Sequence, residues 1–384
     1  MSLENATPAD VVIVGGGIIG LSIAHALRRK DVSRVLVLER GNCGEGSTAK
    51  ATGGIRVQFG TEINIRLSLL SLESFRNWTE LIGGDVGYRP TGYVFLATDD
   101  AQFERLERGA ALQRSLGASV EILSVDEIRR RLPAVQAADL VGASLGPEDG
   151  SADPGAAVVS LLASCRRLGV RVVEHCEVIG FELAGGRVAG VVSKAGRFPA
   201  DVVVNAAGAW SDPLAQMVGA TLPVSPHHRQ VYVAGQVAGL PVPSPLVIDL
   251  STGCYFHQDH HGLVFGGGDR ESEPGYDDRT WPQEAPRIVE MLIQRLPAIR
   301  DAPLRRMWAG LREMTPDDVG IVGFIPAVPN FFVAAGFSGH GFMHSPGVGE
   351  IAAALITGGS PPFDVSAMDP GRFRGESRSE GYVF

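Results

Sequence analysis

The chain has 384 residues, of which 45% are hydrophobic and 20% are charged, an ordinary composition for a folded protein with room for two domains. Its formal net charge of −9 is not accompanied by a basic stripe, which argues against nucleic-acid binding. The four cysteines form no CxxC pair. They indicate free thiols in a reducing compartment, and we expect a cytoplasmic protein.

Two features near the N-terminus bear on targeting. The first ten residues carry Glu4 and Asp10 and no basic side chain, so we expect no signal peptide. The apolar stretch 11–27 has about the length of a membrane span, but Gly15, Gly16 and Gly17 interrupt it. A strand, a turn and a helix explain this stretch better, and we expect no membrane insertion.

Residues 11–39 have the pattern of a strand, a glycine turn, a helix and a second strand. Residues 11–14 form a β-branched run typical of a buried parallel strand, residues 18–29 have helical spacing, and residues 35–38 form the next strand. Gly15, Gly17 and Gly20 form a GxGxxG motif, and Glu39 ends the second strand about 20 residues later. This context predicts a dinucleotide-binding unit, with a glycine-rich turn that binds no ligand as the alternative.

Each residue of this motif has a physical role in binding a dinucleotide. Gly15 permits the tight turn, Gly17 lets backbone N–H groups reach a pyrophosphate, and Gly20 lets the helix lie close to the sheet. The helix N-terminus offers partial positive charge to the phosphates. Glu39 would bind ribose hydroxyls and repel a 2′-phosphate, which leaves FAD or NAD. The small, polar, glycine-rich segment 46–54 favours FAD, because its hydroxyls and amides suit a pyrophosphate and a flavin ring; a flexible loop is the alternative.

The rest of the chain mixes helices, parallel strands and antiparallel strands. We expect helices at 62–82, 101–116, 125–132, 154–168 and near 348–355. Strands are expected at 92–98, 170–181, 188–193, 201–205 and 331–335. Alternation and turns in residues 222–310 predict an antiparallel sheet. The fold class is therefore α/β, with a parallel nucleotide-binding core and an inserted antiparallel sheet.

Five motifs together resemble one enzyme family. They are residues 12–17 with Glu39, residues 47–48 with 53–54, residues 203–210, residues 308–312 with 315–317, and residues 335–341. Over residues 11–355 the chain is similar to the FAD-dependent amino-acid oxidase family, which contains D-amino-acid oxidase, glycine oxidase and monomeric sarcosine oxidase. It is most like glycine oxidase and the flavin subunits of bacterial sarcosine oxidase and proline dehydrogenase.

The resemblance implies a Rossmann-type, glutathione-reductase-like FAD-binding core with an inserted antiparallel β-sheet substrate domain. We expect residues 1–85, 140–220 and 305–384 to form the discontinuous FAD-binding domain. Residues 86–139 and 221–304 would form the substrate-binding domain. The oligomeric state is left open.

The resemblance also assigns cofactor contacts. Ala206, Ala207, Gly208 and Trp210 would lie against the flavin and the adenosine part of FAD. Val178 would contact the adenine through its backbone, and the amides of 336–341 would lie near the pyrimidine end of the flavin. The residues expected to bind FAD are Gly15, Gly17, Ile18, Gly20, Glu39, Arg40, Ser47, Thr48, Thr52, Gly53, Gly54, Val178, Ala207, Gly208, Trp210, Gly310, Gly336, Ser338, Gly339, His340 and Gly341.

Three residues are expected to act at the substrate site. Arg312 matches the arginine that pairs with the substrate carboxylate in glycine oxidase, where a guanidinium presents two parallel donors. Tyr255 matches a tyrosine that helps to hold the same carboxylate, and His340 is the ionisable group of the 336–341 loop. The alternatives are a surface arginine paired with Glu313, a buried strand tyrosine and a structural histidine.

Three departures from the family pattern matter. Gly310 stands where monomeric sarcosine oxidase has the cysteine that links to the flavin, so we expect non-covalent FAD. Met343 replaces a lysine that helps to bind the carboxylate, so Arg312 needs other help and a larger apolar substrate would be tolerated. The oxygen-activating lysine of sarcosine oxidase has no match in residues 269–274. The sequence therefore supports amine dehydrogenation more strongly than it supports oxidase activity.

In this family a hydride passes from the substrate to flavin N5, and water hydrolyses the resulting imine. We therefore expect oxidation of the C–N bond of an N-substituted glycine or another secondary amino acid, with O2 reduced to H2O2. The alternatives are a flavin subunit of a dehydrogenase complex that passes electrons to a partner, and a flavin-binding protein without catalysis. No metal is expected, because the spacing of the histidine pairs at 227–228 and 260–261 and of His257 fits no standard zinc site.

Overall fold

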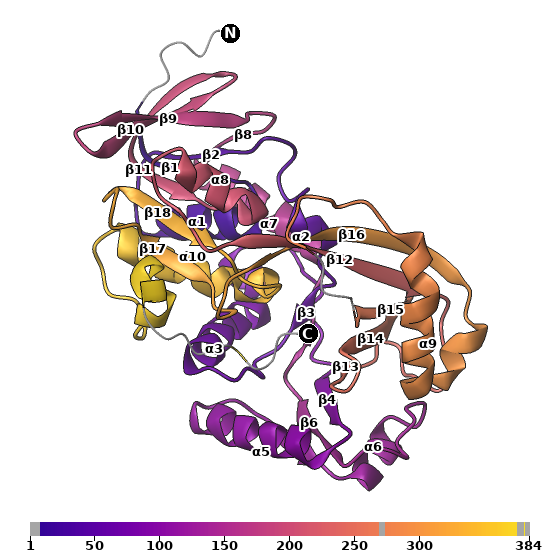
Figure 1. Cartoon of the computed structure of the whole chain (residues 1–384). Helices are drawn as coiled ribbons and strands as arrows, with labels where there is room; N and C mark the ends of the chain where they lie inside the picture. Colours follow the sequence, from indigo (N-terminus) through magenta and orange to yellow (C-terminus); the bar gives the residue numbers. More distant parts are fainter. Residues whose placement is uncertain (1–7, 269–272, 375–379, 381–384) are drawn as a thin grey trace.

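The computed structural model describes residues 8–268, 273–374 and 380, and Figure 1 shows two sheets with helices around them. Four residues of the 269–274 stretch compared with sarcosine oxidase, 269–272, lie outside the described residues.

The first sheet is the core of the nucleotide-binding part. Its strands in spatial order are β17 (Ile321–Phe324), β18 (Phe331–Ala335), β11 (Gly196–Asn205), β1 (Ala9–Val14), β2 (Val35–Leu38) and β8 (Arg171–Val173). All neighbours are parallel except β17, which runs antiparallel to β18. The start of β11 also pairs with β10 (Arg187–Ser193), which pairs with β9 (Val178–Ala184). The β-branched residues of β1 are buried, as a strand covered on both faces requires.

Helices pack on this sheet and on one another. The helix α1 (Ile18–Arg29) contacts α10 (Gly341–Ile356) and α7 (Pro154–Arg167), and α10 contacts α3 (Glu62–Arg76). Shorter elements of this part are α2 (Ser47–Lys50), β3 (Gly54–Ile55), α4 (Trp78–Leu81), β7 (Gly150–Ser151), η1 (Gly208–Trp210), α8 (Ser211–Gln216), η4 (Ser366–Met368) and η5 (Pro370–Arg374).

The second sheet forms the other half of the molecule. Its strands in spatial order are β16 (Leu304–Met314), β12 (Ser225–Ala234), β15 (Gly262–Gly267), β14 (Cys254–Asp259), β13 (Leu246–Asp249), β4 (Tyr93–Ala97), β6 (Gly142–Gly146) and β5 (Glu121–Leu123). The helices of this half are α5 (Asp100–Ser115), α6 (Val125–Arg131), η2 (Pro282–Glu284), α9 (Ala285–Arg295) and η3 (Pro297–Asp301). The pairs are antiparallel except β13 with β4, which are parallel.

The expected α/β architecture with an inserted, largely antiparallel sheet is confirmed, with local corrections. The expected strand 170–181 is two separate strands, β8 and β9. The helix expected near 348–355 begins earlier, at Gly341. The early start could not be predicted because Pro346 lies within the helix, and proline usually interrupts a helical pattern. The helix expected at 62–82 breaks at Asn77 into α3 and α4.

The expected domains were given as residue ranges. Two strands within the ranges of the FAD-binding domain pair with strands of the second sheet instead. β6 and β16 pair in the second sheet, although residues 140–220 and 305–384 were assigned to the FAD-binding domain. β16 is therefore a strand of the second sheet that leads the chain back into the first. No helix within the described ranges combines the length and apolar character needed to cross a membrane.

Candidate cofactor and substrate site

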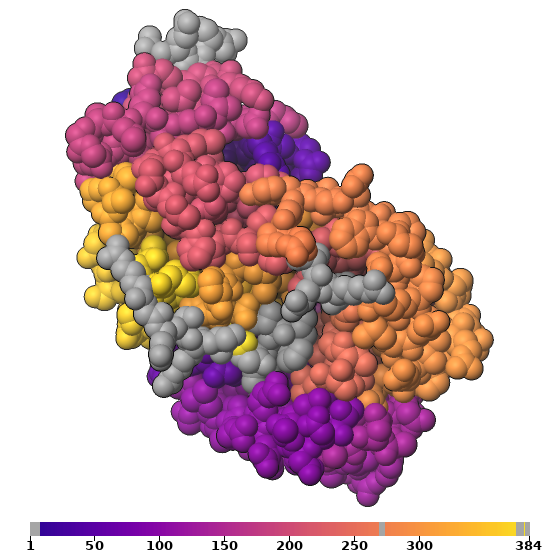
Figure 2. Space-filling model, in the orientation of Figure 1, coloured from indigo at the N-terminus to yellow at the C-terminus, as the bar shows by residue number. Residues whose placement is uncertain are grey.

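A cavity of about 700 Å³ takes its walls from both sheets. One end is formed by the glycine turn after β1 and by the end of β2; the other is formed by β4, β13, β14, β16 and the start of α10. In the space-filling view the surface is hollowed where the indigo N-terminal residues meet the coral segment beside them (Figure 2). A cavity of this size that spans so many elements suits an extended cofactor together with a small substrate.

The glycines of the turn differ in what surrounds them. Gly15 has a φ of +111°, and a Cβ added there would lie 2.4 Å from the carbonyl oxygen of Ala206. A Cβ on Gly20 would lie 2.0 Å from the carbonyl oxygen of Gly15. At Gly17 the nearest atom would be Thr48 Oγ1 at 3.5 Å, which is an ordinary contact. Gly15 and Gly20 therefore serve the local fold, whereas Gly17 is open toward the cavity that it lines.

The Glu39 carboxylate, at the end of the second strand, holds the glycine turn in place. It accepts hydrogen bonds from the backbone N–H groups of Gly16 (2.7 Å) and Gly41 (2.9 Å). Next to it, the guanidinium of Arg40 stacks 3.6 Å above the Trp210 ring. This end of the cavity offers carboxylate oxygens and a flat aromatic surface, the groups that an adenosine would contact.

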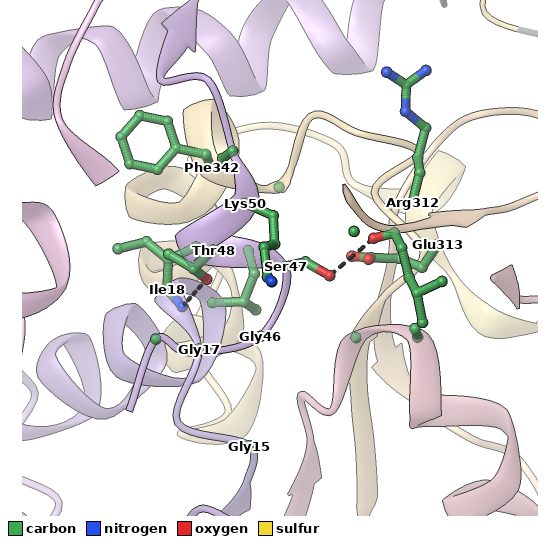
Figure 3. A pocket seen from close by; sticks show the side chains of 18 of the residues that line it. Gly15, Gly17, Ile18, Gly46, Ser47, Thr48, Lys50, Arg312, Glu313 and Phe342 are labelled. Atoms are coloured by element: carbon green, nitrogen blue, oxygen red, sulfur yellow. Dashed lines mark hydrogen bonds between the residues drawn. The ribbon is translucent and has the colours of Figure 1, made fainter. Parts of the chain in front are cut away.

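The segment 47–50 is fixed between the glycine turn and β16. Thr48 Oγ1 accepts a hydrogen bond from the N–H of Ile18 at the start of α1 (3.1 Å), and the Ser47 hydroxyl donates to the carbonyl oxygen of Leu311 (2.9 Å), as Figure 3 shows. The Lys50 stem covers Gly310, where an added Cβ would lie 2.8 Å from Lys50 Cβ. Gly310 therefore makes room for Lys50, a cavity residue that the sequence analysis did not single out.

The residues expected to hold the substrate come together at the other end. Arg312 of β16 lies over Gly339, where an added Cβ would be 2.7 Å from Arg312 Nε. Tyr255 of β14 lines the same cavity, and so does His340, which precedes α10. Met343, at the start of α10, is a buried member of the wall.

Arg56 is a second arginine at this end of the cavity, and no role was predicted for it from the sequence. It is 3% exposed, lines the cavity and lies over the Phe59 ring, with 4.0 Å between the guanidinium carbon and the ring centroid. One of its nitrogens lies 3.2 Å from His340 Nε2. Because arginine only donates, Nε2 must be the acceptor in this contact. Its position directly after the glycine-rich segment 46–54 is the signal in the sequence that could have identified it.

Burial and positive neighbours keep the histidines of this region neutral. Burial, followed by the charge of Arg56, holds the pKa of His340 well below its ordinary value. The same causes lower the pKa of His344 to about 3, and His344 Nε2 lies 2.8 Å from the Ser68 hydroxyl. His340 is therefore a neutral acceptor that helps to position Arg56.

Behind Arg56, a buried network holds the chain segment after β3 that carries it. Asp149 is 0% exposed and accepts hydrogen bonds from the Val57 N–H (2.9 Å) and Gln58 Nε2 (3.1 Å). Gln58 also accepts a hydrogen bond from the Ser144 hydroxyl (2.7 Å). Burial raises the pKa of Asp149 to about 7, against the lowering effect of these hydrogen bonds.

Asp149→Asn is expected to remove part of the pH dependence of stability. The folded-state pKa is raised from 3.8 to about 7, so the folded protein binds the extra proton and its stability falls as pH rises through this range. Between pH 5 and pH 8 this fall amounts to about 2–3 kcal/mol in the free energy of unfolding. Urea unfolding at the two pH values should show the fall reduced by that amount in Asp149→Asn and unchanged in Asp301→Asn, which alters an exposed carboxyl. An equal fall in wild type and Asp149→Asn would contradict the assignment.

Most of the residues expected to bind FAD line this cavity. Those that line it are Gly15, Gly17, Ile18, Glu39, Arg40, Ser47, Thr48, Thr52, Gly53, Gly54, Val178, Ala207, Gly208, Trp210, Gly310, Gly339, His340 and Gly341. Gly20, Gly336 and Ser338 are not part of the wall. Gly336 packs against Thr315, and the Ser338 hydroxyl accepts from the Thr315 N–H (3.2 Å), so both shape the loop from behind.

Within the described ranges, histidine, cysteine, aspartate and glutamate side chains form no cluster of three or more that could hold a metal ion. His227 and His228 lie on β12 and His257 lies on β14. The four cysteines, all of them among the described residues, form no disulfide.

Comparison with known proteins agrees with this geometry. A family described as FAD dependent oxidoreductase matches residues 10–355. FAD-dependent oxidoreductase domain-containing protein 1 of Xenopus laevis is 32% identical, and the match covers 95% of this chain and 82% of that protein. The chain belongs to the FAD-dependent oxidoreductase family. The expected family, its FAD cofactor and its character as an enzyme are thereby confirmed.

Solved structures of this family share the fold over nearly the whole chain. An L-proline dehydrogenase from P. horikoshii is 33% identical with a TM-score of 0.91, and the match covers 97% of this chain and 99% of that one. A glycine oxidase from Geobacillus kaustophilus is 27% identical with a TM-score of 0.85, covering 95% and 99%. Human mitochondrial dimethylglycine dehydrogenase is 26% identical, and this chain spans 44% of its length.

The residues present fit FAD. The open face of Gly17 and the first turn of α1 would receive the pyrophosphate, and Glu39 with Trp210 would receive the adenosine. The remaining cavity, up to Arg312 and Arg56, has room for a flavin ring and a small substrate.

FAD is expected to be released intact when this oxidoreductase is denatured with acid. Gly310, at the position of the linking cysteine, has no side chain, and the Lys50 stem covers it. Acid precipitation of the holoenzyme should therefore leave a yellow supernatant and a colourless pellet. A pellet that keeps flavin fluorescence after washing would contradict non-covalent binding.

Proposed function

We propose that this oxidoreductase oxidises the C–N bond of an N-substituted glycine or another secondary amino acid and passes the electrons to O2, forming H2O2. The observation that carries the proposal is the placement of Arg312, Arg56 and Tyr255 at the end of the cavity remote from the dinucleotide turn. Two guanidinium groups supply donors that suit a carboxylate. The apolar side chains of the surrounding wall, which suit a substituent on nitrogen, are Val231, Leu246, Ile248 and Met343.

FAD, when bound, supplies the acceptor for the hydride that leaves the carbon next to the amine nitrogen. The protein's own contribution is to bind and orient the substrate. Arg312 fixes the carboxylate, and the apolar wall excludes water, so that the C–H bond is held in one orientation. His340, neutral and bonded to Arg56, keeps that guanidinium in place without adding charge. Water then hydrolyses the imine product to a carbonyl compound and an amine.

A second candidate is the flavin subunit of a dehydrogenase complex that passes electrons to a partner chain. The likeness to an L-proline dehydrogenase, at 33% identity over 97% of this chain, favours it. None of the four cysteines is in a disulfide, which suits a reducing, cytoplasmic location in either case.

One experiment separates these candidates. Under anaerobic conditions, the yellow protein is mixed with glycine, sarcosine, proline and N-alkyl or N-carboxymethyl amino acids. Bleaching of the flavin absorption band at about 450 nm is recorded. Air is then admitted and H2O2 is measured. Bleaching followed by stoichiometric peroxide supports the oxidase, and bleaching that persists in air, with no peroxide formed, favours the dehydrogenase subunit. A flavin band that none of these amines reduces would end the proposal.

A further inference from the structure

Glu313 is an acidic side chain that lines the cavity beside Arg312. Successive residues of a strand face opposite sides, so the two side chains diverge. Arg312 lies over Gly339, whereas a carboxylate oxygen of Glu313 is 3.8 Å from the position of a Cβ added to Gly208. Figure 3 shows the Glu313 carboxylate directed toward the side of the cavity that holds Ser47, and the Arg312 guanidinium directed away from it.

The protein compensates this half-buried acid only in part. Glu313 is partly exposed, and it lines the cavity. Burial raises its pKa to about 7, and the backbone N–H groups of Glu313 and Phe337 and the charge of Arg312 offset part of this shift. A carboxylate in such surroundings gains stability from additional hydrogen-bond donors.

The position of Glu313 indicates which part of the cofactor it meets. Gly208 follows β11 beside the glycine turn, and Ser47 belongs to the segment bonded to that turn through Thr48. Arg56 lies against Phe95 of β4, and Tyr255 belongs to β14, so both line the cavity at the second sheet. An extended FAD that ran from the turn toward these residues would have its ribityl chain near Glu313.

We propose that Glu313 binds the ribityl hydroxyls of FAD. A carboxylate accepts hydrogen bonds from hydroxyl groups and is repelled by phosphates, so it suits the polyol chain rather than the pyrophosphate. Two consecutive residues of β16 then serve different ligands. Glu313 holds the cofactor, and Arg312 faces the part of the cavity that remains for a substrate.

The test measures FAD binding and needs no substrate, so its outcome is independent of the proposed reaction. Apoprotein of the wild type, Glu313→Ala and Glu313→Gln is titrated with FAD and with FAD analogues that each lack one ribityl hydroxyl, and quenching of flavin fluorescence gives the dissociation constants. We expect Glu313→Ala to weaken FAD binding at least about tenfold and Glu313→Gln to weaken it less, because the amide keeps one acceptor. One analogue should bind wild type about tenfold more weakly than FAD does, yet bind Glu313→Ala as well as FAD does.

Two results would overturn the proposal. One is unchanged FAD affinity in Glu313→Ala; the other is additive losses for the substitution and for every analogue. Glu107→Ala, which removes an exposed carboxyl that is not part of the cavity wall, is the control and should bind FAD normally. Circular dichroism of each apoprotein checks folding. If Glu313→Ala does not fold, Glu313→Gln with the same analogues decides the question by the same criterion.

Discussion

Gly17→Ala is expected to yield a folded protein that no longer retains FAD. The added methyl group would have Thr48 Oγ1 as its nearest neighbour, at 3.5 Å, and Gly17 has ordinary extended dihedrals, so the apoprotein should keep its stability. The methyl group would, however, project where backbone N–H groups must meet the pyrophosphate. We expect FAD affinity to fall roughly 100-fold, or about 3 kcal/mol. Flavin fluorescence titration and urea unfolding of the apoprotein measure the two quantities.

Two further glycine substitutions make this test specific. Gly20→Ala should destabilise the apoprotein itself, because its methyl group would lie 2.0 Å from the carbonyl oxygen of Gly15 and backbone cannot move aside easily. Gly180→Ala on β9, whose nearest neighbour would be Val192 Cβ at 4.0 Å, should leave both FAD affinity and stability unchanged. Normal FAD binding by Gly17→Ala would mean that the pyrophosphate does not lie on this turn.

Arg312→Ala is expected to raise the Michaelis constant of a carboxylate substrate by roughly 30- to 1,000-fold, or about 2–4 kcal/mol. The physical reason is that the substrate carboxylate would be left in the cavity without its bidentate partner. FAD binding should not change, because Arg312 points away from the part of the cavity where the glycine-rich segment lies. Steady-state kinetics with the amine found in the anaerobic panel, together with the flavin absorption spectrum, measures both effects.

A matched pair of controls tests whether charge is responsible. Arg305→Ala removes an exposed arginine from the same strand and should leave the Michaelis constant unchanged. A substrate analogue with an amide in place of the carboxylate should be oxidised poorly by wild type and about equally poorly by Arg312→Ala. If Arg312→Ala binds the acid as well as wild type does, Arg312 has no role in carboxylate recognition.

Much of the nucleotide-binding part could be predicted because its signals are local. The strand at 35–38 and the helix at 18–29 have the expected bounds, since β-branched runs and helical spacing act over a few residues. Gly15, Gly17 and Glu39 could be identified from spacing alone, because the βαβ unit is continuous in sequence. The family, FAD and the overall fold class followed from such motifs. The start of α10 did not, because Pro346 conceals a helix whose stability comes from packing on α1 and α3.

The substrate end was decided by tertiary structure, because its residues are brought together by pairing between distant segments. The sequence indicated Arg312 and Tyr255, but not that Arg56 and Lys50 share their cavity; this depends on β16 lying across the segment 47–50. The parallel pairing of β4 with β13, and the place of β6 and β16 in the second sheet, likewise join strands far apart in the chain. Strand propensity does not specify a partner, since hydrogen-bonding edges of all strands are alike and packing of the whole sheet selects among them.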